Sequence, residues 1–434
     1  MKNKGIFKIL YVGFIGVLLT GCGGEAEVKQ TNESLHVHIG NALNAGAIHY
    51  AALAFQAAYP DIPLEITESD RDTYEGIEAD QEKLFTDIMS GDGPDLFFLE
   101  NTWDVDKLIE AGVLADLSQI YEKCNVFKED FIDTVMEQSV VDGKRYFIPY
   151  DFKLPVLLTT EEVLEETGFN TEKCTDFPKF MEESLRYINS DKNDRKIFRL
   201  AASITYPMVW AGYSFVEDGK VVWDIEETRD YFNWYKTLAP QGTEEVSMFG
   251  DLYPAEAVRD RECIFTDLSV DSYNITVNIR ALSAVGTPVL VPLYDLNGGL
   301  TAIVDQMIGV RANSENMDNV QKFIEILFRK DIMNSPGAAS ENYSVRRPTW
   351  EEDAINWQGE FGKSVNGFPA DLPDPTEEMF DEYYSFVDEI DRVVYGNKWR
   401  TEIKDAMSGY CTGEKTYEEA AEEAKKNIEF YLSE

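Results

Sequence analysis

Hydrophobic and polar positions follow two different periods near the start of the folded region. Residues 35–39 alternate with a period of two, which is typical of a strand with two distinct faces. Hydrophobic residues then recur at helical spacing from Ile48 to Tyr59, and residues 63–66 again have the composition of a strand. This order predicts a β-loop-α-β unit, which favours a parallel sheet.

The same alternation of helices and strands continues along the chain. Residues 84–89 predict a helix, and 95–99 form the short apolar run expected of a buried parallel strand. Further helices are predicted at 105–109, before Gly112, and at 320–327; the last helix follows a capping box of Thr416 and Glu419. The pattern predicts an α/β protein without internal repeats.

Composition narrows the class of protein. The chain has 434 residues, 44% of them hydrophobic, which excludes a disordered chain and favours more than one hydrophobic core. Its formal net charge of -41 makes nucleic acid a poor partner, because like charges repel. With 3 His and 5 Cys the chain is short of soft metal ligands, so we expect no metal site and no cofactor.

The N-terminus predicts export. Lysines precede an uncharged, mostly apolar run at 9–19, which is too short to span a bilayer but fits a signal-peptide core. Residues 19–22 (LTGC) resemble a lipobox, in which the thiol of Cys22 receives lipid. We therefore expect a lipoprotein signal peptide at 1–21 and a lipidated tether at 22–34, which would hold the protein on the extracytoplasmic face of the cell membrane. The alternative is an ordinary secretory signal with an incidental cysteine.

Several common kinds of chemistry are not indicated. The chain lacks the GxSxG, HExxH, P-loop and GxGxxG motifs, so no catalytic residue is assigned. The side chains of His36 and His38 share one strand face and His49 lies in the next helix, where packing is the preferred interpretation. The other four cysteines form no CxxC motif; isolated thiols are preferred, and disulfide pairing stays open for Cys124, Cys174, Cys263 and Cys411.

Segments along most of the chain resemble the extracellular solute-binding proteins of family 1, the sugar-binding components of ABC transporters. The motifs stand in the family's order behind the lipobox, and residues 175–260 are the most divergent stretch. They are AFQAAYPDI (54–62), GPDLF (93–97), AGVLADL (111–117), GKRYFIPY (143–150), Gly298-Gly299, the helix at 320–328 and YSVRRP (343–348).

The resemblance implies a two-lobe periplasmic-binding-protein-like fold of type II, with discontinuous lobes and a ligand cleft between them. It places the N-terminal lobe at 35–150 plus 292–342, and the C-terminal lobe at 151–291 plus 343–434. Independently, open parallel sheets bind ligands beyond the carboxyl ends of their strands, where the loops after Ile39 and Leu99 lie.

A sugar site needs aromatic rings that stack on C–H faces, together with planar donors and acceptors for hydroxyl groups. Some candidates follow predicted strands, others lie in a loop-like segment of the second lobe or at the crossovers that the resemblance implies. The candidate ligand-binding residues are Asn41, Asn44, Glu100, Asn101, Trp103, Asp151, Tyr206, Trp210, Asp267, Asp295, Gly299 and Arg346.

Each candidate has a structural alternative. Most tryptophans pack in or on a core, and this is preferred for Trp223, Trp234, Trp350, Trp357 and Trp399. Aspartates after strands often cap helices, as Asp104 and Asp271 would. The alternative for Arg346 is an ion pair with a neighbouring carboxylate. The alternative for Asp151 and Lys153 is to steady the first crossover between the lobes.

The preferred function is a monomeric, lipid-anchored binding protein, not an enzyme, that passes a carbohydrate, in particular an oligosaccharide, to the permease of an ABC importer. An extracellular glycan hydrolase with two carboxylates is the alternative from another class. The same fold with a peptide, polyamine or metal as cargo, or with a sensory role, also stays open.

Overall fold

The computed structural model describes most of the chain. The described residues are 34–40, 45–69, 74–100, 103–128, 131–197, 205–217, 219–238, 255–266, 275–335, 343–358, 372–395 and 399–433. The expected signal peptide (1–21), most of the tether (22–34) and Cys22 lie outside them. No helix among the described residues is both long and apolar enough to cross a bilayer.

Helices and strands alternate, as the sequence pattern predicts. The strands are β1 (Leu35–His38), β2 (Leu64–Thr67), β3 (Leu96–Glu100), β4 (Val140–Val141), β5 (Lys144–Arg145), β6 (Phe147–Lys153), β7 (Val156–Thr160), β8 (Val216–Glu217), β9 (Lys220–Val221), β10 (Pro288–Pro292), β11 (Leu300–Val310), β12 (Tyr343–Ser344) and β13 (Ile390–Tyr395). The first helices are α1 (Ala45–Ala58), α2 (Tyr74–Met89), α3 (Val105–Glu110), α4 (Ser118–Lys123), α5 (Asp133–Met136), α6 (Glu161–Thr167), α7 (Phe177–Ile188), α8 (Thr205–Trp210) and α9 (Arg229–Leu238). The others are α10 (Ala255–Arg259), α11 (Ile275–Ser283), α12 (Met317–Leu327), α13 (Lys330–Met333), α14 (Trp350–Trp357), α15 (Glu377–Ser385), α16 (Arg400–Thr412) and α17 (Tyr417–Ser433).

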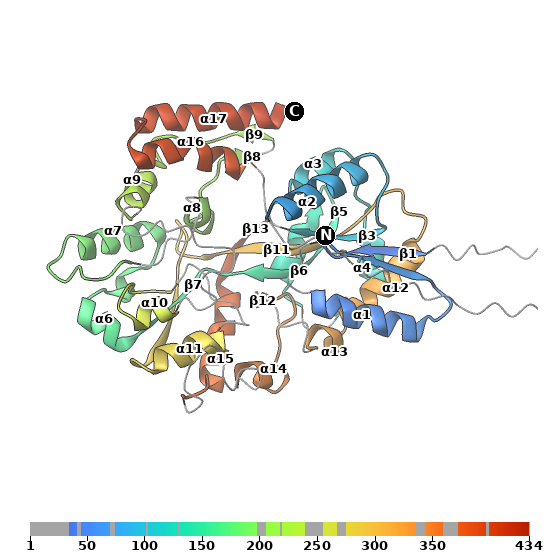
Figure 1. The fold of residues 1–434 in the computed structure, drawn as a ribbon, viewed down its shortest axis with the longest axis horizontal. Helices are drawn as coiled ribbons and strands as arrows, with labels where there is room; N and C mark the ends of the chain where they lie inside the picture. Colours follow the sequence, from blue (N-terminus) through green and yellow to red (C-terminus); the bar gives the residue numbers. More distant parts are fainter. Residues whose placement is uncertain are drawn as a thin grey trace, which may run out of the picture.

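A mixed sheet runs through the middle of the molecule, in the order β12-β6-β11-β3-β1-β2, with β13 paired to β11. Strand β1 pairs in parallel with β2 and β3, which confirms the predicted parallel unit. Strand β11 runs antiparallel to β3 and β6, because it returns from the opposite direction. In Figure 1 helices α1, α2, α3 and α12 surround one end of this sheet, while β6 and β11 extend toward the other half of the molecule.

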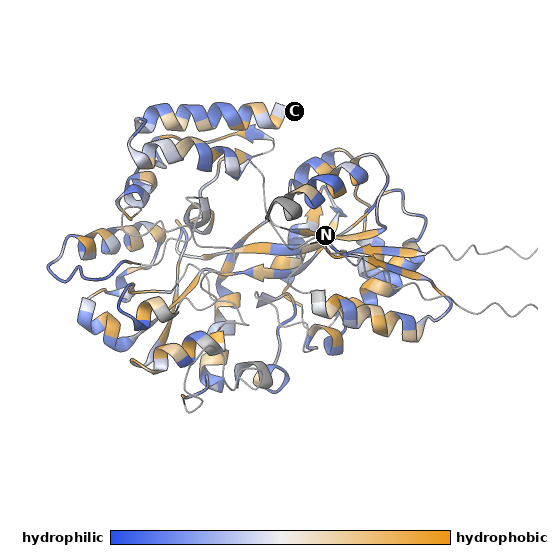
Figure 2. Ribbon diagram, viewed as in Figure 1, coloured by the Kyte–Doolittle hydropathy of each residue, from blue (hydrophilic) through white to orange (hydrophobic). Residues whose placement is uncertain are grey.

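Burial explains why these segments form the sheet. All of the residues of β11 are buried, as are the first four of β3, so these largely hydrophobic strands have no solvent face. Figure 2 shows hydrophobic colour along the central strands, whereas helices such as α17 alternate between hydrophobic and hydrophilic residues. The helices therefore cover the sheet with one face and meet water with the other.

A second, smaller sheet lies in the other half of the molecule. Strand β7 pairs antiparallel with β10. On its other side the backbone N–H of Thr266 donates to Leu158 O at 2.9 Å, and that of Ile264 donates to Lys196 O at 2.8 Å. The segment at 263–266 therefore lies between β7 and the segment around Lys196.

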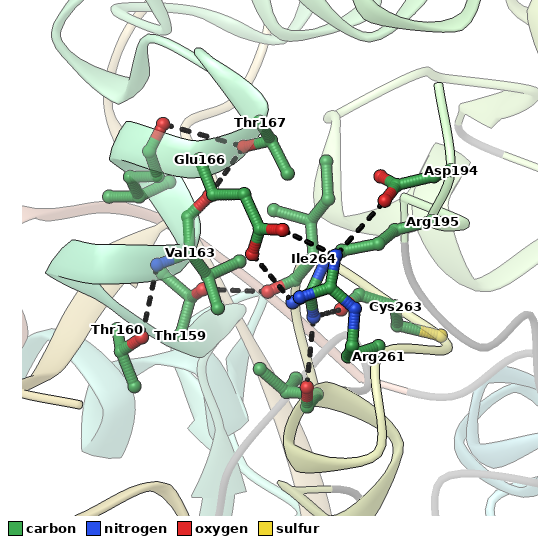
Figure 3. Close-up of polar contacts among 12 residues, drawn as sticks. Thr159, Thr160, Val163, Glu166, Thr167, Asp194, Arg195, Arg261, Cys263 and Ile264 are labelled. Atoms are coloured by element: carbon green, nitrogen blue, oxygen red, sulfur yellow. Dashed lines mark hydrogen bonds and ion pairs between the residues drawn. The ribbon is translucent and has the colours of Figure 1, made fainter. Parts of the chain in front are cut away.

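Arg195 joins the pieces of this second half. Its buried guanidinium donates to the carbonyl oxygens of Val258, at 3.0 Å, and Cys263, at 3.3 Å. The same group pairs with Glu166 of α6 at 3.0 Å, and Arg261 reaches Glu166 from the other side (Figure 3). One side chain thus connects α6, the end of α10 and the strand segment at 263.

The structure corrects one local prediction. Tyr206 and Trp210, expected in a loop-like segment, lie in helix α8. Pro207 is compatible with this helix because it stands in the first turn, where its missing N–H would be unpaired in any case. The final capping box is confirmed: Thr416 N–H donates to Glu419 Oε2 at 2.9 Å, and Glu419 N–H donates to Thr416 Oγ1 at 3.2 Å.

Candidate functional site

The carboxyl ends of β1 and β3 lie side by side at one edge of the central sheet. A Cβ on Gly40 would lie 3.7 Å from Oε1 of Glu100, the last residue of β3. Gln81 of α2 donates its Nε2 to Oε2 of Glu100 at 3.1 Å. Trp103 follows shortly after β3, and the centroid of its ring lies 6.1 Å from that of the Phe85 ring. The predicted convergence of these two strand ends is confirmed.

Polar side chains form a row across four neighbouring strands at this level of the sheet. Gln306 of β11 is paired with Glu100 of β3 on one side and with Asp151 of β6 on the other. Asp151 is in turn paired with Ser344 of β12. The backbone N–H of Gln306 donates to Asp151 Oδ1 at 3.0 Å, across a register shift in the β6–β11 pair. Polar groups in the middle of buried strands are costly, so this row marks the centre of a candidate site.

An ion pair lies beside the row. Lys153 Nζ is 3.1 Å from Asp305 Oδ2, and both residues belong to the strands that lead from the central sheet toward the second half of the molecule. It joins β6 to β11 where the chain leaves and re-enters the central sheet. The predicted crossover near Asp151 and Lys153 is thus formed by β6, which continues into β7.

A second polar group surrounds Asp295, in the loop between β10 and β11. Its Oδ1 accepts the backbone N–H groups of Asn297, at 2.8 Å, and Gly299, at 3.2 Å. Its Oδ2 accepts the hydroxyl of Thr301 at 3.3 Å. Asp295 is almost completely buried, so these bonds replace the water that its carboxylate loses on folding.

Asp391 and Arg392 of β13 complete this group. A Cβ on Gly299 would overlap the Asp391 carboxylate, so only glycine fits there without movement. Burial raises the pKa of Asp391, and the neighbouring charge of Asp295 raises it further. Burial lowers the pKa of Arg392, whose Nη1 would lie 2.9 Å from a Cβ on Gly212. Charges of both signs therefore lie close together here, with Asp295 buried, Arg392 partly buried and Asp391 exposed, and shifted pKa values of this kind are common at functional sites.

Trp210 lies against the same strand pair. Its buried ring packs on Ile303 of β11 and Val394 of β13. Within the described part of the chain, neither its Nε1 nor Nη1 of Arg392 has a hydrogen-bond acceptor, although both atoms are buried. Arg392 and Val394 share one face of β13, because they are two residues apart in a strand. This face therefore presents two donors that an acceptor-rich molecule would satisfy.

Arg346 has a protein partner. Its Nη1 is 2.9 Å from Glu352 Oε2, and Glu352 also contacts Lys330. The alternative that Arg346 pairs with a neighbouring carboxylate is thus confirmed. Ligand contact by Arg346 stays a prediction.

Not all candidates can be placed. Asn41, Asn44, Asn101 and Asp267 lie outside the described residues, as does the side chain of Tyr206. The structure brings together two groups: Glu100, Trp103 and Asp151 near the end of β3, and Trp210, Asp295 and Gly299 near β13. It adds Gln306, Asp391 and Arg392, which the sequence analysis did not single out.

The site residues that the sequence analysis missed have only weak signals in the sequence. Gln306 and Asp305 are the polar pair inside the otherwise apolar run 300–310, which a search for polar interruptions would have found. Asp391 and Arg392 stand at the start of a short strand and look like ordinary surface residues in the sequence. Their site role depends on Gly299 and Gly212, far away in the chain.

The described cysteines are free thiols, and two of the histidines contact a neighbouring strand. Three of the four described cysteines are buried. His36 Nε2 and His38 Nδ1 both contact Thr67 Oγ1, at 3.0 and 2.9 Å, so the prediction that they share a face is confirmed. The described residues contain no cluster of three or more His, Cys, Asp or Glu side chains suited to a metal ion.

Two α/β lobes linked by β6, β11 and β12, with polar side chains gathered where these strands cross, define a periplasmic-binding-protein-like fold of type II. The chain belongs to the bacterial extracellular solute-binding protein family, whose model matches residues 41–334. Members of this family are solute-binding components of transporters rather than enzymes, and the fold and the resemblance inferred from the sequence motifs agree with it.

Similar proteins support this assignment. A protein of Brucella abortus described as a binding protein is 25% identical over 305 residues, covering 64% of this chain and 67% of its own. The sugar-binding protein MalE of Xanthomonas citri has a TM-score of 0.65 at 15% identity, over 92% of this chain and 98% of that one. The GacH receptor of Streptomyces glaucescens, whose structures include a complex with acarbose, has a TM-score of 0.62 at 16% identity, over 93% and 99%.

Proposed function

We propose that this protein captures a carbohydrate, in particular an oligosaccharide, outside the cell and delivers it to the permease of an ABC importer. The observation that carries the proposal is the buried pair of donors, Trp210 Nε1 and Arg392 Nη1, beside the Asp295 group. Sugar hydroxyls accept hydrogen bonds from such donors, and indole rings stack on sugar C–H faces. One similar structure is that of a sugar-binding protein and another includes a complex with acarbose, which supports the same class of cargo.

The two lobes that would close on this cargo are joined by the strands that link the halves of the molecule. We propose the boundaries expected from the sequence: 35–150 plus 292–342 for one lobe and 151–291 plus 343–434 for the other. Ligand that touches both lobes stabilises the closed arrangement by its differential affinity, and the permease would recognise that arrangement. The candidate ligand-binding residues would then line the cleft between the lobes.

The ligand prediction can be tested with the purified full chain in detergent and a panel of oligosaccharides, maltotetraose among them. We expect one class of sugar to change tryptophan fluorescence and, at 100 times its Kd, to stabilise the fold by about 2.7 kcal/mol. We expect Trp210→Phe, which removes the indole donor, to weaken binding roughly tenfold. The readouts are titration calorimetry and the melting temperature.

The matched control is Trp350→Phe, because Trp350 packs on Phe380 with ring centroids 5.6 Å apart, away from the crossing strands. It should bind sugar like the unchanged protein. If no sugar in a broad panel changes fluorescence or melting temperature, the carbohydrate proposal is wrong. Release of reducing sugar by the pure protein would instead favour a hydrolase.

We further propose that lipid on Cys22 anchors the protein at the extracytoplasmic face of the cell membrane. The support is the charged, apolar and lipobox-like order of residues 2–22. We expect Cys22→Ala to move the protein from the membrane fraction to the soluble fraction, because two acyl chains hold a protein far better than none. Fractionation followed by immunoblotting measures this; a variant that stays with the membrane contradicts the anchor.

A further inference from the structure

The C-terminal helix α17 is fixed at its first turn to the segment that starts α9. The hydroxyl of Tyr417 lies 2.9 Å from Thr228 Oγ1 and donates to Ile225 O at 2.5 Å. Arg229 pairs with Glu418 at 2.8 Å, and its guanidinium stands 4.5 Å from the centroid of the Tyr417 ring. This end of the helix therefore belongs to the second lobe.

The other end of α17 contacts α3, which follows the carboxyl end of β3 in the first lobe. The hydroxyl of Tyr431 donates to Oδ2 of Asp104. Lys107 Nζ donates to the backbone oxygen of Tyr431 at 3.1 Å and stands 4.0 Å from the centroid of its ring. Three contacts thus hold one tyrosine against the first turn of α3.

The partner side of this contact makes further hydrogen bonds. Asp104 uses its other oxygen, Oδ1, to cap α3 by accepting the backbone N–H of Lys107 at 3.1 Å. Tyr395 donates its hydroxyl to Asp106 of the same helix at 2.6 Å; its strand β13 pairs with β11 in the central sheet, although the proposed boundaries count this strand with the second lobe. Burial raises the pKa of Tyr431, and Asp104 raises it further, so the phenol keeps the proton that it donates.

We propose that Tyr431 is a latch that joins the two lobes in their closed arrangement without any ligand. The inference rests on the proposed lobe boundaries, not on the identity of the cargo. Helix α17 has 17 residues and hence spans about 25 Å, so a rotation of the lobes moves its far end by several ångströms. That movement breaks a hydrogen bond. Since Asp104 lies beyond the carboxyl end of β3, where the lobe presents its predicted ligand loop, the latch forms on closing.

Such a latch sets how much of the free protein is already closed. A ligand that binds only the closed arrangement has an apparent affinity proportional to the closed fraction. The chain therefore adjusts ligand affinity through a side chain that need not touch ligand. Tyr431→Phe removes the donated hydrogen bond and leaves the ring in place.

The experiment measures the distance between the lobes in the ligand-free full chain in detergent. Spin labels are placed at Leu53→Cys on α1 and Glu165→Cys on α6, both exposed, for pulsed dipolar spectroscopy. We expect Tyr431→Phe to lower the ratio of closed to open molecules about tenfold, which is the typical value of a hydrogen bond to a charged group. Lys107→Met should shift the distances in the same direction.

The matched control is Tyr410→Phe, because the Tyr410 hydroxyl contacts Asn233 within one lobe. It should leave the distances unchanged. Burial raises the pKa of Cys124 and Cys174 to about 12 and that of Cys411 to about 11, so labelling near neutral pH favours the introduced thiols.

Two results would overturn the latch. If Tyr431→Phe gives the same distances as the unchanged protein, the contact does not hold the lobes. If it gives shorter distances, the contact belongs to the open arrangement. Neither result depends on which sugar, if any, the protein binds.

Discussion

Replacing Arg195 by methionine is expected to lower the free energy of unfolding by about 3–4 kcal/mol. The Arg195 side chain is 3% exposed and supplies hydrogen bonds to the carbonyl oxygens of Val258 and Cys263, which the variant loses together with the ion pair to Glu166. A thioether cannot replace these bonds. Urea denaturation followed by circular dichroism measures the loss.

Arg261 provides a matched control for the Arg195 variant. Arg261 contacts the same acid, Glu166, but its side chain is 55% exposed and it reaches Asp194 across water-exposed surface (Figure 3). Exposed ion pairs contribute little, because water and salt screen them. Arg261→Met should therefore lose only a small fraction of what Arg195→Met loses. Equal losses in the two variants would show that burial of Arg195 is not what stabilises this half of the protein.

The elements that could be predicted from sequence are those whose signal is local. The parallel unit β1-α1-β2, the buried strand β3 and the capping box at Thr416 each depend on residues a few positions apart. Helix α8 was mistaken for a loop because it has only six residues and carries Pro207, so neither length nor periodicity indicated a helix. Short helices are stabilised by tertiary packing, here that of Trp210 on Ile303.

The candidate site could be predicted only in part, since its residues meet across the chain. Asp151 and Gln306 are bonded over a separation of 155 residues, and no local pattern connects them. Gly299 gave a partial signal: it was a candidate ligand-binding residue, and the group that lies against it in the structure is the Asp391 carboxylate. The stabilising role of Arg195 was not predicted because it depends on carbonyl groups that have no sequence signature.

Acid is expected to destabilise the protein through His38. Burial, and next the charge of His36, lower the pKa of His38 from 6.5 to about 4, while Asp80 acts in the opposite direction. In the unfolded chain His38 therefore takes up a proton below about pH 6.5, whereas in the folded protein it does so only near pH 4. Because the unfolded state binds more protons in this window, stability falls as the pH falls through it, by about 3 kcal/mol at most.

His38→Gln isolates this contribution, since glutamine keeps hydrogen-bonding capacity toward Thr67 and Ser69 but does not titrate. The free energy of unfolding should fall less steeply between pH 6.5 and pH 4 in this variant than in the unchanged protein. His49→Gln, which removes a half-exposed imidazole 3.0 Å from Glu68, serves as the control for loss of a histidine. Parallel pH profiles for His38→Gln and the unchanged protein would mean that the imidazole is hydrated in solution. His38 ends β1, so acid would loosen the protein at the edge of the sheet where the candidate site lies.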